Sequence, residues 1–201
     1  MGLHRPPPKT MRRSSVETRR LAHAIAVAAL VVCLPAAFAS DSSAQSSRTP
    51  PAPGLVFAFE LRVTVGTPVM VGQVSRGQRR IVSILGGTFE GPTIKGKVVP
   101  GGADWQIIRA DGFSELDTRY TLETEKGQLI YVQNAGMRHA APAVMEKLLK
   151  GETVDPKLVY FRTIPTFETA APDLQWLTRA VFIGTGERYP TEVVIRFWRV
   201  E

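Results

Sequence analysis

The sequence predicts an all-β domain, a single closed up-and-down antiparallel β-barrel of about 8–10 strands with one short helix near 142–150. Apolar and polar residues alternate through many short segments, as in strands that bury one face. Glycine and proline turn signals separate most of these segments, and only one segment has a helical pattern. Because the turns are short, consecutive strands are expected to be neighbours, which favours a barrel over a sandwich.

The first 39 residues have the pattern of a secretory signal peptide. A group of arginines precedes the apolar segment 21–34, and Ala37-Phe38-Ala39 matches a cleavage site. The apolar segment is shorter than the about 20 residues that span a bilayer, so an uncleaved anchor is the less favoured alternative. We expect cleavage after Ala39 and a periplasmic or secreted protein, with no stable membrane insertion after cleavage.

The basic charge of the chain is concentrated in the predicted signal peptide. The whole chain has 25 basic and 18 acidic residues and a formal net charge of +7. Residues 1–39 hold six of the basic residues and one of the acidic ones, so residues 40–201 carry +2. A net charge this small gives no reason to expect a nucleic acid as a partner.

The rest of the chain divides into a linker and a domain. Residues 40–53 are rich in serine and proline, which predicts a disordered linker. Residues 54–201 are expected to form the β-barrel domain, because a segment of this length can bury its own core. The one cysteine of the chain, Cys33, lies in the predicted signal peptide, so we expect no disulfide in the domain.

About nine strands are expected along the domain. They are residues 55–65, 80–85, 93–98, 105–109, 116–124, 128–134, 158–164, 176–183 and 191–200. Turns are predicted between several of them, among others at Gly86-Gly87, Pro100-Gly101-Gly102 and Gly184–Gly186. The expected helix begins with Pro142 and ends before Gly151, the usual positions of these two residue types.

Residues 91–98, GPTIKGKV, come close to a phosphate-binding loop but lack two of its requirements. Val98 stands where a serine or threonine would bind Mg²⁺, and a proline–glycine turn follows where a helix should begin. We therefore interpret Gly91, Gly96 and the glycines at 101 and 102 as barrel corners, turns or close backbone approaches.

Several separated motifs resemble one known family. They read GTFEGP at 87–92, PGGADW at 100–105, YFRT at 160–163, FET at 167–169 and WLTR at 176–179. In this order they resemble the bacterial and fungal proteins grouped as domain of unknown function 3237, over about residues 55–200. The resemblance implies a compact β-barrel over the whole mature domain, and it implies no established activity.

The common catalytic constellations are missing from residues 54–201 of the sequence. His139 is the one histidine of this segment, which has no cysteine, so a metal site built from histidine and cysteine is not expected. No G-x-S-x-G nucleophile motif occurs. We expect no cofactor.

Charged residues set among apolar ones are the remaining signal for a functional site. Arg162 and Arg179 each lie in an apolar strand segment, and a buried arginine needs a carboxylate partner. Asp104 and Glu168 are the candidate partners. Such a pair is either a structural brace or part of a ligand pocket.

We expect a functional pocket to be one mixed apolar and charged cavity in the barrel interior. Asp104 and Glu168 are its expected acid/base residues, because burial raises the pKa of a carboxyl group towards useful values. An arginine would stabilise negative charge beside them. The expected ligand-binding residues are Trp105, Arg119, Tyr131, Arg162, Trp176 and Arg179.

Three functions stay open from the residues alone. The first is an exported barrel that holds a small aromatic or carboxylated molecule in its interior. The second is a cofactor-independent isomerase, lyase or hydrolase that uses the same carboxylate and arginine, with isomerisation, dehydration, cyclisation and hydrolysis left unranked. The third is a structural or protein-interaction module, with no oligomeric state predicted.

Overall fold

The computed structural model describes residues 50–201, in which nine strands form one antiparallel sheet. The predicted signal peptide 1–39 and most of the predicted linker 40–53 lie outside the described residues. The strands are β1 (Leu55–Val65), β2 (Val69–Val74), β3 (Gly77–Glu90), β4 (Lys95–Ile108), β5 (Ser114–Thr124), β6 (Leu129–Ala140), β7 (Val159–Glu168), β8 (Phe182–Arg188) and β9 (Glu192–Val200). The helices are α1 (Pro142–Leu149) and two 3₁₀ helices, η1 (Pro156–Leu158) and η2 (Pro172–Thr178).

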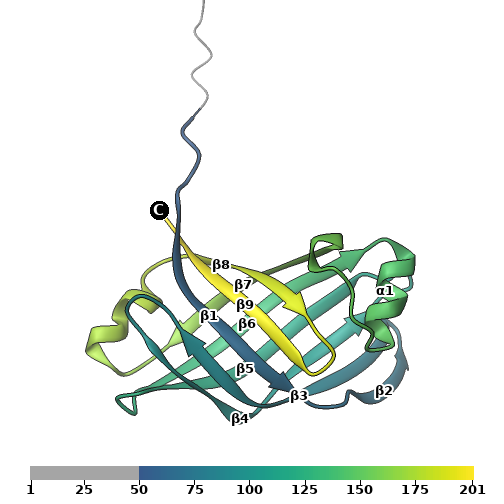
Figure 1. The fold of residues 1–201 in the computed structure, drawn as a ribbon, viewed down its shortest axis with the longest axis horizontal. Helices are drawn as coiled ribbons and strands as arrows, with labels where there is room; N and C mark the ends of the chain where they lie inside the picture. Colours follow the sequence, from purple (N-terminus) through teal and green to yellow (C-terminus); the bar gives the residue numbers. More distant parts are fainter. Residues whose placement is uncertain (1–49) are drawn as a thin grey trace, which may run out of the picture. The chain divides into compact units, whose positions relative to one another are not determined.

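The sheet closes because β1 pairs on one side with β9 and on the other side with β3. Strands β3 to β9 follow one another in sequence order, and β2 pairs with the first half of β3 beside the closed ring. Figure 1 shows this ring, with α1 and β2 at the same end. The predicted fold class, a closed up-and-down antiparallel barrel with a helix near 142–150, is confirmed.

Backbone hydrogen bonds also join the two ends of the domain. The N–H of Gly54 donates to the carbonyl oxygen of Glu201 at 3.0 Å, and the N–H of Glu201 donates to Gly54 at 2.9 Å. These bonds extend the β1–β9 ladder, so the two ends lie side by side (Figure 1).

Two of the predicted turns are bulges within long strands. The pairing register shifts between Ser83 and Gly87 in β3 and between Val99 and Ala103 in β4, and both strands continue beyond the shift. Glycines with positive φ allow the backbone to bend there while the ladder resumes. The glycines do mark an irregular backbone at these positions, but the chain bends within one strand there and does not turn back into the next strand. The glycines predicted to form a turn at 184–186 likewise lie within β8.

The segment 176–183, predicted as a strand, begins instead as part of η2. Leu174 and Leu177 are the buried residues of this helix, and their spacing of three matches one turn of a 3₁₀ helix. The prediction of one strand there was wrong because the apolar residues at the end of η2 and at the start of β8 are only a few positions apart in the sequence. The short strand β2 was not predicted.

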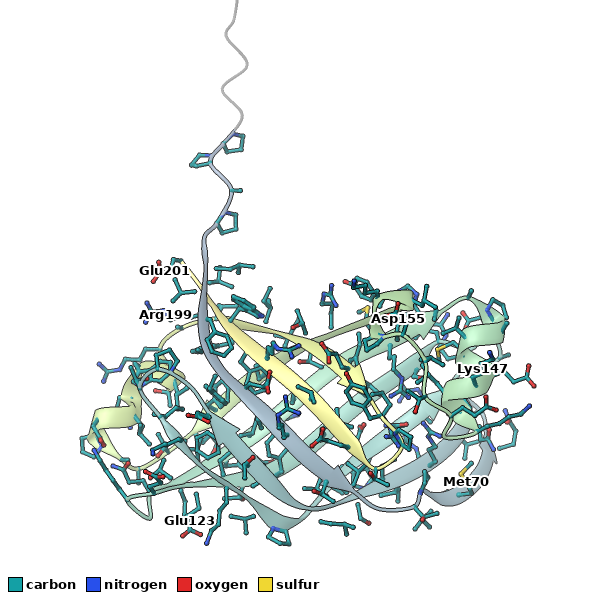
Figure 2. The ribbon with its side chains drawn as sticks, viewed as in Figure 1. Met70, Glu123, Lys147, Asp155, Arg199 and Glu201 are labelled. Atoms are coloured by element: carbon teal, nitrogen blue, oxygen red, sulfur yellow. The ribbon has the colours of Figure 1, made fainter. Side chains whose placement is uncertain are left out.

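Helix α1 packs on the barrel through one side. Met145 and Leu148 are buried, and they pack with Val154 in a small cluster separate from the main core. Lys147 is exposed on the outer side of the helix (Figure 2). None of the described helices has the length and apolarity needed to cross a bilayer. We call the barrel end beside α1 the α1 end, and the opposite end, beside η2, the η2 end.

Aromatic side chains fill the interior at the η2 end. The ring centre of Phe59 lies 5.8 Å from that of Phe89 and 5.2 Å from that of Phe197, both in edge-on contact. Phe167 lies 5.2 Å from Phe182, which η2 covers through Trp176. Edge-on contacts of this kind add to the stabilisation that burial provides. The η2 end is therefore a packed core.

The glycines of the GPTIKGKV segment allow strands to approach one another closely. A Cβ atom on Gly96 would lie 2.1 Å from the carbonyl oxygen of Glu123, and one on Gly91 would lie 2.2 Å from that of Ala58. Real Cβ atoms do not come so near to backbone atoms. The interpretation of these glycines as close-approach positions is confirmed.

We predict that Gly96→Ala destabilises the barrel by about 1–3 kcal/mol, because the added methyl group must push β5 away from β4. Urea denaturation followed by circular dichroism measures the change. Gly66→Ala is the matched control, because a Cβ at Gly66 meets only side-chain atoms of Leu85 at 3.6–3.8 Å. Equal stability losses for the two variants would contradict this explanation.

Candidate functional site

The interior of the barrel at the α1 end is polar. Seven inward-facing residues of five strands define what we call the interior polar cluster: Arg80, Asp104, Gln106, Thr118, Tyr120, Arg138 and Arg188. All of them except Arg80 line a cavity of about 40 Å³, and Arg80 bonds to the cavity residue Gln106. The other walls of the cavity are aliphatic side chains of β1, β3 and β9 together with Phe161 of β7.

Asp104 is held in the cavity wall by hydrogen bonds to both of its carboxylate oxygens. Its Oδ2 accepts from Nε2 of Gln106 at 2.5 Å, and its Oδ1 accepts from the backbone N–H of Asp117 at 3.2 Å. Oε1 of Gln106 in turn accepts from Nε of Arg80 at 2.7 Å. The carboxylate is therefore connected to Arg80 through a neutral amide. Asp104 is the one carboxylate among the cavity-lining residues.

Alternation along β4 brings Asp104 inside. Asp104 and Gln106 both line the cavity, while Trp105 between them is 37% exposed on the outer face. Successive side chains of a strand point to opposite faces, so the two polar residues share the interior.

Arg138 is the most deeply buried charged residue of the described chain. Its side chain lies in the cavity wall, and the residue is only 2% exposed. Its Nε has no hydrogen-bond partner among residues 50–201, and no carboxylate there forms an ion pair with it. The guanidinium carbon lies 5.6 Å from the centre of the Phe161 ring, a cation–π contact. A buried charge normally has a paired counter-charge. Arg138 has the through-space attraction of the Asp104 charge, which raises its pKa, but no hydrogen-bonded carboxylate among residues 50–201.

The surroundings shift the pKa values of the cluster in opposite directions for its acid and its bases. Burial raises the pKa of Asp104, although the hydrogen bond from Gln106 and the charge of Arg138 oppose this. Burial, together with the charges of Arg80 and Arg188, lowers the pKa of Arg138 to about 10, although the charge of Asp104 opposes this. Burial also lowers the pKa of Arg80 and of Arg188. The cluster holds three guanidinium groups against a single carboxyl group.

Further polar groups in the interior have no partner among the described residues. They are the hydroxyl groups of Ser114, Tyr120 and Thr163 and both side-chain polar atoms of Asn134. Buried polar atoms in folded proteins are nearly always hydrogen-bonded, to protein, water or ligand. These groups can therefore bond to molecules that enter the interior.

The structure does not bring the predicted site residues together. Asp104 alone lines the interior cavity. Five other predicted site residues lie on the outer surface of strands β4 to β7: Trp105, Arg119, Tyr131, Arg162 and Glu168. On that surface, Nη2 of Arg119 lies 3.5 Å from Oδ2 of Asp117. The guanidinium carbon of Arg162 lies 5.0 Å from the centre of the Tyr160 ring.

The sequence pattern suggested the wrong inward face for the strand that contains Arg162. Tyr160 and Ile164 made the face of Arg162 look apolar, yet they are 45% and 63% exposed. The inward residues of β7 are Phe161, Thr163, Pro165 and Phe167. The other two predicted ligand-binding residues belong to η2 and its end: Trp176 packs on the core, and Arg179 is exposed.

Sequence reasoning missed the arginines and the glutamine that surround Asp104. Arg138 has the same parity as Ile130 and Val132, so it belongs to the buried face of β6. The predicted strand ended at Asn134, and this shorter boundary hid the signal.

Two other kinds of site are less well supported. A larger hollow of about 490 Å³ lies on the outer surface beside Phe57 and Trp176, but it contains no buried ionisable side chain. Within residues 50–201, no three histidine, cysteine, aspartate or glutamate side chains cluster closely enough to hold a metal ion. The interior cavity is therefore the candidate site.

Comparison with known proteins agrees with the fold. Residues 53–200 match the family model described as "Protein of unknown function (DUF3237)". The chain belongs to this family. A UPF0311 protein of Rhodopseudomonas palustris is 46% identical over 139 residues, which cover 69% of this chain and 91% of the relative. The crystal structure of a conserved protein of unknown function from the same species has a TM-score of 0.72 at 41% identity, covering 75% of this chain and 99% of that chain.

A more distant relative has a named activity. The hydroalkoxylation enzyme of Penicillium herquei is 25% identical over 159 residues, which cover 79% of this chain and 91% of the relative. The DUF3237 barrel is therefore similar both to uncharacterised bacterial proteins and to one named fungal enzyme.

We predict that the pKa of the Asp104 carboxyl group lies above its ordinary value of 3.8, whereas the pKa of Glu187, bonded to Arg196, lies below its ordinary value of 4.5. Carbon-13 NMR titration of side-chain carboxyl groups measures both. Because the folded-state pKa of Asp104 is raised, its ionisation lowers stability as pH rises from the unfolded-state value through the folded-state value.

Arg138→Met should raise the pKa of Asp104 further, since the charge of Arg138 favours the carboxylate. Arg162→Met, on the outer surface, serves as the control and should leave it unchanged. An Asp104 pKa below 3.8 in the wild type would contradict the described burial.

Proposed function

We propose that the barrel of this protein binds a small molecule in its interior cavity and transfers protons on it with Asp104, in a reaction that needs no cofactor. The observation that carries the proposal is the juxtaposition, in one cavity, of the Asp104 carboxyl group, whose pKa is raised, and the buried Arg138, whose Nε has no hydrogen-bond partner among the described residues. The export pattern of residues 1–39 adds a periplasmic or secreted location to the proposal.

The two groups have complementary chemical roles. A carboxyl group whose pKa is raised by burial keeps its proton nearer to neutral pH and can donate it to a substrate. A guanidinium group beside it stabilises negative charge that is present or develops on oxygen. Perturbed titrating groups in a cavity are typical of active sites.

We favour addition of a hydroxyl group across a carbon–carbon double bond as the reaction. The name of the Penicillium herquei relative supports this choice, and a cyclisation of the same kind occurs when both groups belong to one molecule. Protonated Asp104 would donate its proton to one alkene carbon while the hydroxyl oxygen bonds to the other. The proton of that hydroxyl group would return to the Asp104 carboxylate. Where the oxygen binds as a phenolate, which has no such proton, a proton from water would restore the acid. The reaction is redox-neutral, and the acid is regenerated.

The test is turnover of phenols that carry an ortho alkenyl chain by the purified full chain, followed by mass spectrometry. In D₂O, the cyclic ether should carry one deuterium on the former alkene carbon. Asp104→Asn should lower the rate by about 100-fold or more, as for loss of a general acid. Circular dichroism and the melting transition verify that the variant is folded.

Glu168→Gln is the matched control, because Glu168 was the other expected acid and lies on the outer surface. It should retain the wild-type rate. Unchanged turnover in Asp104→Asn would refute the role of Asp104. A folded wild type that converts none of the alkenyl phenols would refute the favoured reaction.

A further inference from the structure

We infer that the interior cavity recognises its ligand through an anionic oxygen group, a carboxylate or phenolate, which binds to Arg138 while a compact apolar body lies against the aliphatic wall. The inference rests on the proposed function for the location of the site, and it names the class of molecule that the site takes.

The first argument is the number of positive charges around the cavity. Arg80, Arg138 and Arg188 belong to the interior polar cluster, and Asp104 is the one acidic residue in it. Oxygens of neutral groups satisfy two of the arginines. Arg80 donates to Gln106, and Arg188 donates to the carbonyl oxygens of Pro190 at 3.1 Å and Glu192 at 3.4 Å. The cluster therefore has a net positive charge and favours an anion over a neutral molecule.

The second argument is the position of Arg138. Of the three arginines it is the most buried, and its Nε lacks a partner among the described residues. A guanidinium group offers two parallel N–H donors, which match the two oxygens of a carboxylate. The contact with the face of the Phe161 ring is a cation–π contact and does not itself occupy the N–H donors of the group.

The third argument is size. Each water-sized atom needs about 10–15 Å³ of such a cavity. The cavity of about 40 Å³ thus holds about three such atoms, which is the size of a carboxylate group. A larger body needs additional room. Arg188 is the cluster residue best able to provide it, because it is only partly buried and its bonds are to carbonyl oxygens of the β8–β9 turn.

The fourth argument is the apolar wall. Val63, Val82 and Ile195 are three of the aliphatic residues that line the cavity beside the polar groups. They cannot bond to a second polar group of the ligand. They therefore favour a ligand with one anionic end and a compact hydrocarbon or aromatic body.

The experiment compares two anions with neutral molecules of similar shape, using the full chain. Benzoate is paired with benzamide, and 4-nitrophenolate with 4-nitroanisole, in isothermal titration calorimetry and thermal melting at pH 8. We expect each anion to bind at least about tenfold more tightly than its neutral counterpart and to raise the melting temperature. Binding of only one anion would identify carboxylate or phenolate as the recognised group.

Arg138→Met tests the residue. It should weaken benzoate binding at least about tenfold. Without ligand it should melt about 2 °C or more above the wild type, because a buried charge with no hydrogen-bonded counter-ion among the described residues has been removed. Arg162→Met, which removes an arginine of the outer surface, should bind benzoate as the wild type does. If Arg138→Met does not fold, Arg138→Lys replaces it. This variant keeps the charge but not the paired donors, so it should bind benzoate more weakly than the wild type.

Several outcomes overturn the inference: benzamide binding as tightly as benzoate, no binding of either anion, or undiminished benzoate binding by a folded Arg138 variant. These results are separable from those for the proposed reaction. Benzoate binding that depends on Arg138, without turnover of alkenyl phenols, would uphold the anion site and refute the reaction. Turnover of alkenyl phenols without any preference for anions would support the reaction and refute the anion site.

Discussion

The pairing of β1 with both of its neighbours decides which side chains of this protein meet. Closure turns an alternating sequence into an inside and an outside, since every strand then sends each second residue into one enclosed space. A ring of eight strands has an interior just wide enough for side chains or one small ligand. Phenylalanines fill that space at the η2 end, whereas an aspartate, a glutamine and two arginines line a cavity at the α1 end, and Arg80 bonds to the glutamine.

The two halves of the interior make opposite contributions to stability. Full burial of a phenylalanine side chain contributes about 1.5–3 kcal/mol, and five phenylalanines lie in the main core. Burial of an ion costs several kcal/mol unless it is well paired. The aromatic half can therefore offset the desolvation of the charged half. A barrel interior packed with aliphatic side chains at both ends would be more stable, but it would offer no group to a ligand.

The sequence predicted the class of the fold because alternation and turn residues are local signals. It predicted less of the strand boundaries, because glycine pairs such as Gly86-Gly87 look alike in a turn and in a bulge. It identified Asp104 of the candidate site but not Arg138. In an isolated strand, both faces of β7 carry apolar residues, and only closure of the ring shows that Phe161 faces inward and Arg162 outward. Where both faces of a strand are apolar, the strands it pairs with decide which face points into the barrel, and the sequence of that one strand does not contain this information.

The joining of Gly54 to Glu201 has a practical consequence. Val56 and Phe57 share a hollow with Trp176 of η2, so both ends of the barrel domain lie near the aromatic half. A carrier or a solid support attached at either end is therefore adjacent to the packed half. Immobilised molecules would share one orientation, with the arginine-lined end towards the surrounding solution and accessible to diffusing solutes.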